Sequence, residues 1–313
     1  MLFDSAEPIA EAYDLGSVLE FTGPVARGEQ GEVWRMHTDR GLWAVKRSYF
    51  DFAATDAQRA GEFQNLARAH GVPTPAAMTT RAGHYGYDVA GALVRVSSWV
   101  EVLQPNSMID PARVGTTIAA LHRAVRPAEG WPHEWSTAPI GTDGWDALLA
   151  EARRQQAPFA DRLAALRSEL LALESLLTPM IPVQTCHLDL WFDNLRATPS
   201  GALCLLDWDN CGPGDPSREV AMVLFDFART SPERIATLYA AYREAGGPGR
   251  VRTPSDFSLL IAQLGHIGAM QMRRWLDPAT SDTERAYALR GIEEFLDDPL
   301  ERATIDRILA VIT

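Results

Sequence analysis

The pattern of apolar and polar positions divides the chain into a strand-rich first third and a helical remainder. Strand-like runs occupy residues 18–27, 31–38 (GEVWRMHT), 41–50 (GLWAVKRSYF), 76–82 and 84–100. After the third run, residues 55–70 have the apolar spacing of a helix, with Thr55 predicted as its N-cap and Gly71 at its end. The first hundred residues are therefore expected to form one antiparallel sheet with a single helix against it.

Beyond residue 105 the apolar positions follow a helical period instead. The period is clearest in RVGTTIAALHRAV (113–125) and ADRLAALRSELLALESLL (160–177). The Gly-, Pro- and Trp-rich stretch between them, residues 126–145, is predicted to be a loop. Short strands around a Pro-Ser-Gly turn at 199–201 interrupt the helical part, which resumes at residue 217 and continues to the end.

The length of 313 residues is enough for two lobes of ordinary size. We predict a β-rich lobe at residues 1–100, a helical lobe at 101–313 and a connector near 98–106. With 46% hydrophobic and 22% charged residues, the composition is that of a globular protein. The expected fold class is α+β, with a small antiparallel N-lobe and a larger, mostly α-helical C-lobe.

The composition disfavours several classes of protein. No uninterrupted apolar run approaches the roughly 20 residues that a membrane helix needs, and the N-terminus MLFDSAEPIAEAYD lacks the basic start of a secretory signal. We therefore expect a cytoplasmic protein with no membrane partner. The cysteines (Cys186, Cys204 and Cys211) form no CxxC pair, so packed thiols are expected rather than disulfides or a zinc site.

The charge balance also limits the partners. The chain carries 29 basic and 41 acidic residues, a formal net charge of −12. Such a field repels polyanions, so nucleic acid is not expected as a partner. The same field would attract a cationic small molecule, although solubility alone would also explain it.

The stretch CHLDLWFDNLRATPSGALCLLDWDNCG (186–212) places polar groups inside one of the most apolar regions of the chain. Asn194 follows Asp189 by five residues and precedes Asp207 by thirteen. Each of them alone is readily explained as a turn cap or a strand end. Phosphoryl transfer, however, needs an acceptor-only group near the attacking hydroxyl and hard oxygen ligands for Mg²⁺, and this set supplies both. A hairpin around the Pro-Ser-Gly turn would bring Asn194 and Asp207 to the same end, which favours one shared site.

Upstream segments contain what such a site needs for a nucleotide. ARGEQGEVW (26–34) has Gly28 and Gly31 between two expected strands, as in a phosphate-covering loop, although a hairpin turn would explain it equally well. Lys46, in the strand sequence WAVK, matches a strand lysine that binds the α- and β-phosphates. The following helix contains Glu62, placed where an ion pair would orient Lys46. Each residue alone is typical of a solvated surface, but their order along the chain favours a nucleotide site.

Taken together, these motifs resemble those of the aminoglycoside phosphotransferase and choline kinase-like family, small-molecule kinases that share the bilobal protein-kinase fold. The resemblance runs from about Gly23 to Phe227. It rests on the Leu-His pair in AALHRAV and on HLDLWFDN, LLDWD and GPGDP. It implies ATP or GTP as phosphoryl donor, Mg²⁺ as the metal and a hydroxyl of a small molecule as acceptor.

The resemblance also implies roles for individual residues. Asp189 would be the catalytic base, and Asn194 and Asp207 would be the Mg²⁺ ligands. Lys46, oriented by Glu62, would hold the phosphates beneath Gly28 and Gly31.

Further roles follow for the neighbouring residues. His187 would be a scaffold residue whose ring hydrogen-bonds nearby backbone, and Asp209 a supporting acid. Asp215 would cap the next helix. The nucleotide base would meet the backbone at 98–101, where Trp99 and Val100 lie.

The chain departs from the family pattern at three places. Leu188 stands where the family commonly has glycine, and Glu219 stands where an aspartate is usual. Trp191-Phe192-Asp193 replaces the usual His-Pro-Gly before the asparagine, so this tripeptide is where we first look for the origin of acceptor specificity.

Two other functions compete with a small-molecule kinase. A protein kinase is disfavoured because GPGDP follows Asp207 almost at once and leaves no room for a peptide-docking segment. A catalytically silent nucleotide-binding regulatory protein is disfavoured because it has no chemical need for the whole polar set. The chain is expected to be a monomer or a homodimer.

The acceptor stays open between an aminoglycoside-like or other antibiotic, with a role in antibiotic resistance, and a metabolite such as an amino sugar, an amino alcohol or a sugar adduct. Acids in and after the insert permit a cationic acceptor, namely Asp143, Asp146 and Glu151, although each is also typical of a solvated surface. The insert tryptophans, Trp131, Trp135 and Trp145, would either line an acceptor wall or anchor the loop by burial.

Overall fold

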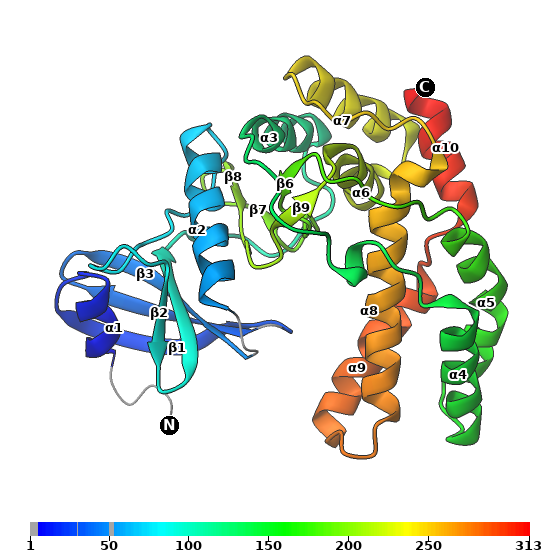
Figure 1. Ribbon diagram of the computed structural model, residues 1–313, viewed down its shortest axis with the longest axis horizontal. Coiled ribbons are helices and arrows are strands. Elements are labelled where there is room, and N and C mark those ends of the chain that lie inside the picture. Colours follow the sequence, from blue (N-terminus) through cyan, green and yellow to red (C-terminus); the bar gives the residue numbers. More distant parts are fainter. Residues whose placement is uncertain (1–5, 30, 50–52) are drawn as a thin grey trace.

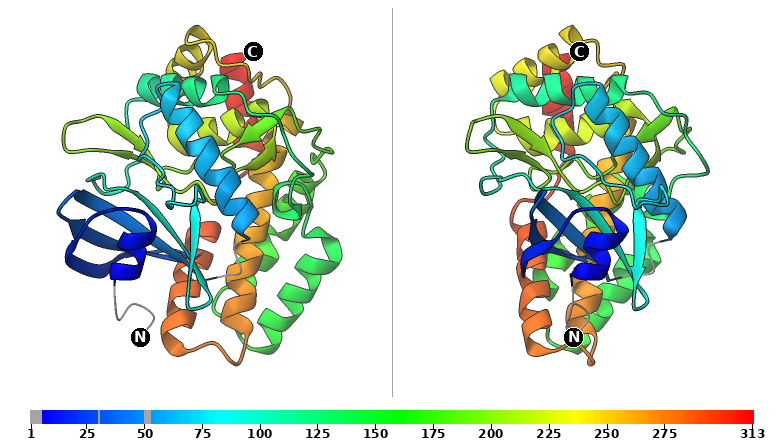
Figure 2. Two further views of the ribbon diagram at one scale, coloured as in Figure 1. Left: turned by 60° about the vertical axis from the view of Figure 1, so that its left-hand side comes forward. Right: turned by 90° about the vertical axis from the view of Figure 1, so that its left-hand side faces the viewer.

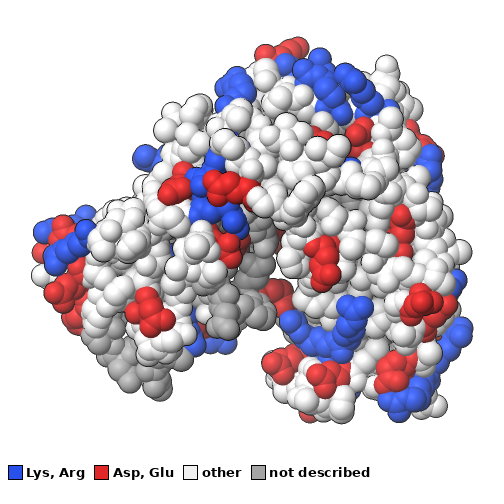
Figure 3. All heavy atoms as spheres, in the orientation of Figure 1, with Lys and Arg blue, Asp and Glu red and all other residues white. Residues whose placement is uncertain are grey.

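The computed structural model describes residues 6–29, 31–49 and 53–313 and divides them into two lobes (Figure 1). The N-lobe is a five-stranded sheet with helix α2 (Ala54–Ala69) beside it, and the C-lobe is mostly helical. In the space-filling view a deep hollow opens between the N-lobe and the C-lobe (Figure 3). None of the helices in the described part of the chain is both long and apolar enough to cross a bilayer.

The N-lobe sheet is antiparallel throughout, in the order β1-β2-β3-β5-β4. Its strands are β1 (Val18–Arg27), β2 (Gly31–Thr38), β3 (Gly41–Ser48), β4 (Gly86–Val89) and β5 (Ala92–Ser98). Apolar side chains of β2, β3 and β5 pack with Ile9 of the short helix α1 (Glu7–Ala12) into a separate core, which includes Met36, Val45, Val94 and Val96. The antiparallel sheet predicted from the alternation is confirmed.

Three local expectations in the N-lobe are corrected. The run 84–100 is divided into β4 and β5, because a turn at Ala90 and Gly91 has positive φ at both residues. Residues 76–82 contribute only an isolated bridge from Ala77 to Ser97. Helix α2 begins at Ala54 with no side-chain cap, so Thr55 is inside the helix rather than its N-cap. Gly71, with φ of 87°, ends the helical segment as expected.

The C-lobe packs its helices around α6. Its helices are α3 (Pro111–Arg123), α4 (Gly141–Arg154), α5 (Ala160–Glu174), α6 (Pro216–Ala228), α7 (Pro232–Glu244), α8 (Ser258–Leu276), α9 (Asp282–Asp297) and α10 (Arg302–Ile312), with 3₁₀ turns η1 (Glu134–Ser136) and η2 (Pro254–Phe257). Every residue of α6 except Ser217 is buried, because α3, α7, α8 and α10 all pack on it. Figure 2 shows α8 and α9 running side by side. The segment 126–145 is not wholly a loop, since its last residues begin α4.

The stretch 184–214, which contains the polar residues of the predicted site, forms two small antiparallel ribbons. These pair β6 (Gln184–Cys186) with β9 (Gly212–Gly214) and β7 (Leu195–Ala197) with β8 (Leu203–Leu205). The β7–β8 turn contains Gly201 at φ of 82°, as the expected hairpin requires. At the far end, the Asp215 carboxylate accepts a hydrogen bond of 2.8 Å from the Ser217 amide and caps α6, which confirms that prediction.

Candidate functional site

The loop between β6 and β7, residues 187–194, holds the centre of the predicted site. His187 is fully buried, and its ring lies edge-on to Trp208 with centroids 4.8 Å apart. Its Nε2 lies 3.1 Å from the carbonyl oxygen of Leu206, which confirms the expected bond from the ring to nearby backbone. Burial lowers the pKa of His187, so the neutral ring donates this hydrogen bond. His187 therefore ties the loop to the strand end that carries Asp207.

Asp189 and Asn194 are brought into direct contact by this loop. The Asn194 Nδ2 group donates to the Asp189 carboxylate at 2.9 Å and to its backbone carbonyl at 3.0 Å. The pKa of Asp189 is raised to about 7, first by burial and then by the negative charge of Asp207, against hydrogen bonds from Asn210 and Asn194 and the charge of Lys46. A carboxyl with this pKa takes up a proton near neutral pH far more readily than an ordinary aspartate.

Asp207 and Asp209 lie just after β8 and share one lysine of the N-lobe. Lys46 Nζ, from β3, is 2.6 Å from Asp207 Oδ1 and 2.8 Å from Asp209 Oδ2. Asp209 also forms an ion pair of 2.5 Å with Arg95 of β5. Burial alone would raise the pKa of Asp209, but Lys46 and Arg95 outweigh it and lower the pKa to about 2. Asp209 is thus a fixed counter-ion for two N-lobe cations, whereas the Asp207 side chain is about one-third exposed.

The prediction that Glu62 orients Lys46 is wrong in this structure. Glu62 of α2 pairs instead with Arg126, which follows α3, at 2.7 Å, and it accepts from Gln58 at 2.8 Å. The Lys46 ammonium already lies between the two carboxylates of Asp207 and Asp209. The physical reason is that an ion pair needs two charged side-chain ends in contact. The carboxylate of Glu62 lies against the Arg126 guanidinium rather than the Lys46 ammonium.

The glycine-bearing loop between β1 and β2 reaches the C-lobe. The Gly28 amide bonds the Gly31 carbonyl at 2.9 Å, and a Cβ at Gly31 would lie 2.3 Å from the Arg47 carbonyl, so glycine is needed there. Glu29 between them forms a bidentate ion pair with Arg274 of α8, at 2.8 and 2.6 Å. No local pattern pointed to this pair, because its members are 245 positions apart.

The connector between the lobes, predicted near residues 98–106, is hydrogen-bonded to the N-lobe sheet. The Trp99 backbone amide donates to the Leu42 carbonyl at 2.9 Å, and the Trp99 ring lies under the Arg35 guanidinium. The amide of Trp99 is therefore already bonded, and contact of the nucleotide base with Trp99 or Val100 stays a prediction.

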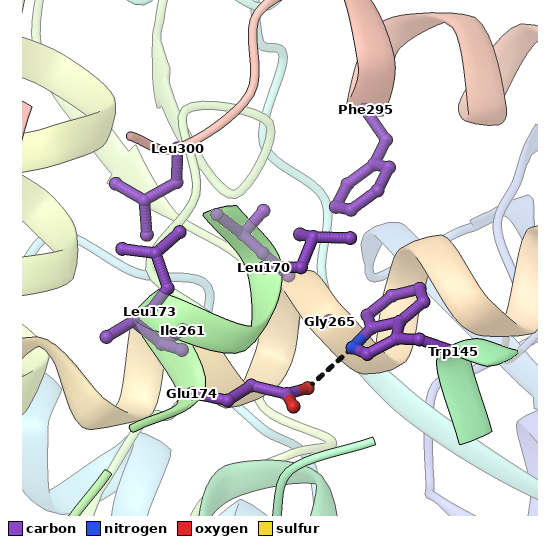
Figure 4. A pocket seen from close by; sticks show the side chains of 9 residues that line it. Trp145, Leu170, Leu173, Glu174, Ile261, Gly265, Phe295 and Leu300 are labelled. Atoms are coloured by element: carbon purple, nitrogen blue, oxygen red, sulfur yellow. Dashed lines mark hydrogen bonds between the residues drawn. The ribbon is translucent and has the colours of Figure 1, made fainter. Parts of the chain in front are cut away.

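The insert tryptophans take different positions. Trp145 is buried, and its Nε1 donates to Glu174 at 2.9 Å beside a cavity of about 20 Å³ (Figure 4). Trp135 stacks on His266 of α8, with centroids 5.3 Å apart, whereas Trp131 is 83% exposed. Of the three, Trp145 acts as an anchor by burial.

The acids considered for a cationic acceptor lie on the surface of α4. Asp146 pairs with Arg167 at 2.5 Å, Glu151 pairs with Arg154, and Asp143 is an exposed residue of the first turn. In the replaced tripeptide, Trp191 and Phe192 pack partly on the C-lobe core and Asp193 is exposed. The Phe192 amide donates to Asp226 of α6 at 2.6 Å, which anchors the tripeptide.

Within the described residues, no three His, Cys, Asp or Glu side chains converge as in an all-protein metal site. The oxygens that the resemblance implies for a metal are those of Asn194 and Asp207. Because Asn194 uses its Nδ2 group on Asp189, the planar amide turns its Oδ1 to the opposite side. One carboxylate and one amide oxygen fit a hard cation whose remaining ligands come from phosphates and water.

Solved structures that share the fold include small-molecule kinases. The chain superposes on a spectinomycin phosphotransferase in complex with ADP and spectinomycin with a TM-score of 0.68 and 11% identity, over 98% of each chain. An aminoglycoside phosphotransferase from Alicyclobacillus acidocaldarius gives 0.57 and 17%, over 98% of this chain and 95% of that one. A choline kinase from Streptococcus pneumoniae gives 0.55 and 19%, over 92% and 98%. The bilobal, protein-kinase-like α+β fold predicted from the motifs is confirmed.

Sequence comparison places the chain in a family. An uncharacterised protein of Deinococcus radiodurans is 30% identical over 166 residues, which are 50% of this chain. The aligned part is 46% of that relative, so the chain spans about half the length of the curated relative that it matches. The sequence profile of the phosphotransferase enzyme family, APH, matches residues 22–253, which is more than half of the chain. The chain therefore belongs to the APH phosphotransferase enzyme family.

Proposed function

We propose that this protein is a small-molecule kinase that transfers the γ-phosphoryl group of ATP or GTP to a hydroxyl of its acceptor. The observation that carries the proposal is the meeting of Lys46, from the N-lobe sheet, with Asp207 beside Asp189 and Asn194. A binding module needs a cation for the phosphates, but it has no use for a carboxyl of raised pKa next to that cation. Membership of the APH family supports the same function.

The residues of the site divide the tasks of this function among them. Asp189 accepts the proton of the attacking hydroxyl, and the Asn194 amide holds the carboxyl in place. Lys46 binds the phosphates of the donor. Asp209, which forms ion pairs with Lys46 and Arg95, keeps the lysine in the site when Asp207 binds another cation. Rate enhancement then comes mainly from positioning and from neutralising the phosphate charge.

The metal fits Asn194 Oδ1 and the Asp207 carboxylate, because both are hard oxygen donors next to Asp189. Bound Mg²⁺ would supply positive charge to the phosphate oxygens. ADP is present in the complex of the spectinomycin phosphotransferase of the same fold, which supports a nucleotide as donor. A nucleotide-dependent enzyme of this kind works where ATP is abundant, in the cytoplasm.

The acceptor is a small molecule with an alcohol group, either an antibiotic such as an aminoglycoside or an amino sugar or amino alcohol. The structures that share the fold include enzymes for both kinds of compound. The acids of α4 do not separate the two, because Asp146 and Glu151 are already paired with arginines at the surface. An antibiotic acceptor would make resistance the biological role.

The test is ADP release by the pure protein with MgATP or MgGTP against a panel of aminoglycosides, nucleoside antibiotics, amino sugars and amino alcohols. We expect at least one acceptor to raise ADP release well above the acceptor-free rate, and the Asp189→Asn variant to lose the increase. If MgATP and MgGTP raise the melting temperature but no acceptor releases ADP, the protein is a nucleotide-binding regulator and the proposal is wrong.

A further inference from the structure

The tip of the β1–β2 hairpin carries an acidic side chain to the C-lobe. The ladder between the two strands ends where Arg27 lies opposite Glu32. Beyond this pair, the Gly28 amide bonds the Gly31 carbonyl at 2.9 Å, and Glu29 lies between these two glycines. In the proposed function this loop covers the phosphates of the donor, where an unpaired carboxylate would repel them. The partners of Glu29 therefore decide whether its charge hinders nucleotide binding or serves it.

Three side chains of the C-lobe converge on the Glu29 carboxylate. Arg274, in the last turn of α8, donates to both oxygens, with Nη1 2.8 Å from Oε1 and Nη2 2.6 Å from Oε2. Gln271 of the same helix donates to Oε1 at 3.1 Å. The hydroxyl of Tyr287, in α9, also hydrogen-bonds Glu29. We call Glu29 and these three partners the Glu29 latch.

The latch keeps Glu29 ionised and neutralises its charge. Burial alone would raise the pKa of Glu29, but the hydrogen bonds from Arg274 and Gln271 and the charge of Arg274 outweigh burial, so the pKa is lowered. The side chains of Arg274 and Glu29 are only 30% and 31% exposed. A bidentate pair in a partly buried position is stronger than a single contact between exposed side chains. The latch therefore favours the arrangement in which the hairpin tip is joined to α8.

Helix α8 also contacts the loop that carries the predicted base. Gln263 precedes Arg274 by roughly three helical turns, so the two side chains lie on the same face of α8. The Gln263 Nε2 group donates to the carbonyl of Leu188, the residue before Asp189, at 2.7 Å. One helix thus binds the glycine-bearing loop near its C-terminal end and the loop of the base further back. When the latch is formed, the glycine-bearing loop has a fixed position relative to Asp189.

We propose that the Glu29 latch joins the two lobes across the nucleotide cleft, positions the glycine-bearing loop over the donor phosphates and slows nucleotide release. The inference rests on the proposed phosphotransferase function, because it takes the space beside Lys46 as the nucleotide site. The nucleotide enters and leaves when the latch is open, and closing of the loop holds its phosphates for transfer. Glu29 is a positioning residue, because its carboxylate binds the C-lobe helices and not the reacting atoms.

The test measures how fast ADP leaves the full-length protein. A fluorescent ADP derivative, bound with Mg²⁺, is displaced by excess ADP in a stopped-flow experiment that needs neither acceptor nor turnover. Glu29→Ala and Arg274→Ala are each expected to raise the dissociation rate at least fivefold, which corresponds to about 1 kcal/mol. The double variant Glu29→Ala/Arg274→Ala is expected to match the single variants, because both act through one contact.

Glu29→Ala separates the latch from a simple effect of charge. Removal of a negative charge near the phosphates would by itself slow the release of ADP, whereas loss of the latch speeds it. The matched controls are Glu20→Ala in β1 and Arg273→Ala in α8, which remove the same charges from exposed positions of the same elements. Their ADP dissociation rates are expected to stay within twofold of wild type.

Hydrogen exchange at the Gly28 amide gives a second readout, in the absence of nucleotide. Exchange is expected to speed up at least threefold in Glu29→Ala and in Arg274→Ala, because the loop loses its anchor on α8, and to stay at the wild-type rate in both controls. Exchange at the wild-type rate in both latch variants would overturn the inference.

Two outcomes of the ADP measurement would also overturn the inference. One is a folded Glu29→Ala variant that releases ADP at the wild-type rate or more slowly. The other is a double variant whose effect equals the product of the two single effects. If the wild-type protein binds ADP but releases none from MgATP or MgGTP with any acceptor, the proposed transfer activity is wrong instead, and the dissociation rates still test the latch.

Discussion

Lys46 and Asp207 form an ion pair between the two lobes, with Nζ 2.6 Å from Oδ1. The two residues are 161 positions apart, and Asp209 pairs with the same ammonium. Because Asp207 is also a proposed metal ligand, a nucleotide and its Mg²⁺ must share this pair of residues. Substitutions at Asp207 and at Asp189 should therefore separate the effect of the metal from the effect of the base.

Asp207→Asn and Asp189→Asn should differ in nucleotide binding. Asp207→Asn removes the only charged donor of the proposed metal site, so we expect MgATP affinity to fall at least 10-fold. Asp189→Asn removes the proton acceptor, so we expect turnover to fall about 10²–10⁴-fold with MgATP affinity within threefold of wild type. Calorimetric titration with and without Mg²⁺ measures the first effect, and ADP release measures the second. Equal losses of affinity in both variants would contradict the division of roles.

Glu62→Ala should have a mild effect on the KM for the nucleotide, and Lys46→Ala should have a severe one. Glu62 bonds Arg126 and Gln58 on a partly exposed face of α2, and such pairs contribute about 0–1 kcal/mol. We expect the nucleotide KM of Glu62→Ala to change less than threefold and that of Lys46→Ala to rise more than 10-fold. Steady-state kinetics at varied ATP concentration measures both KM values. A Glu62→Ala variant as impaired as Lys46→Ala would mean that Glu62 binds Lys46 during turnover.

Gly265→Ala should stabilise the protein. Gly265 lies within α8 and lines the cavity beside Trp145 (Figure 4), where an added Cβ would find Ile140, Glu174 and Trp145 at 3.6–3.8 Å, ordinary contact distances. Replacing a mid-helix glycine by alanine contributes about 1 kcal/mol, which raises Tm by about 2–4 °C.

The matched control for that prediction is Gly268→Ala in the same helix. Its Cβ would lie 3.0 Å from three atoms of the Phe295 ring, closer than normal contact. Crowding should cancel the gain in helix propensity, so Tm stays level or falls. Equal increases of Tm in both variants, measured by thermal unfolding, would show that packing at the cavity plays no part.

Asp226→Asn should remove a pH dependence of stability. Burial raises the pKa of Asp226 to about 6 and nearby Asp193 adds to the rise, against the Phe192 amide and Arg229. Because the folded pKa lies above the unfolded value of about 3.9, the stability from protonated Asp226 is present below pH 4 and is lost as pH rises through 6. The asparagine keeps an acceptor for Phe192 and cannot ionise. Relative to wild type, the variant should gain about 2 kcal/mol between pH 4.5 and 7.5, measured by urea unfolding. A parallel pH profile in both proteins would contradict this.

Much of the site was predictable because it is local or follows from a hairpin. Asp189 and Asn194 belong to one loop, so their spacing alone predicts that they meet. The Pro-Ser-Gly turn then brings β8, and with it Asp207, back to that loop. Asp215 as the cap of α6 likewise follows from a short-range pattern. The errors of detail, such as Thr55 inside α2 and the helical end of the insert, fall at element boundaries, where propensity discriminates weakly.

The partners of the charged residues were decided by the tertiary structure. Helical and strand periods tell which face a side chain takes, whereas an ion pair needs two side-chain ends within about 4 Å. Lys46 therefore pairs with Asp207 and Asp209 rather than Glu62, and Glu29 reaches Arg274 across the cleft. For the same reason, the hydrogen bond from the Leu188 amide to Glu219 could not be predicted from the sequence. Most of the elements and the chemistry of the loop 187–194 could be predicted from the sequence, because they depend on neighbours in the chain. Only the packing of the two lobes decided which charges meet, because that depends on distances between segments far apart in the chain.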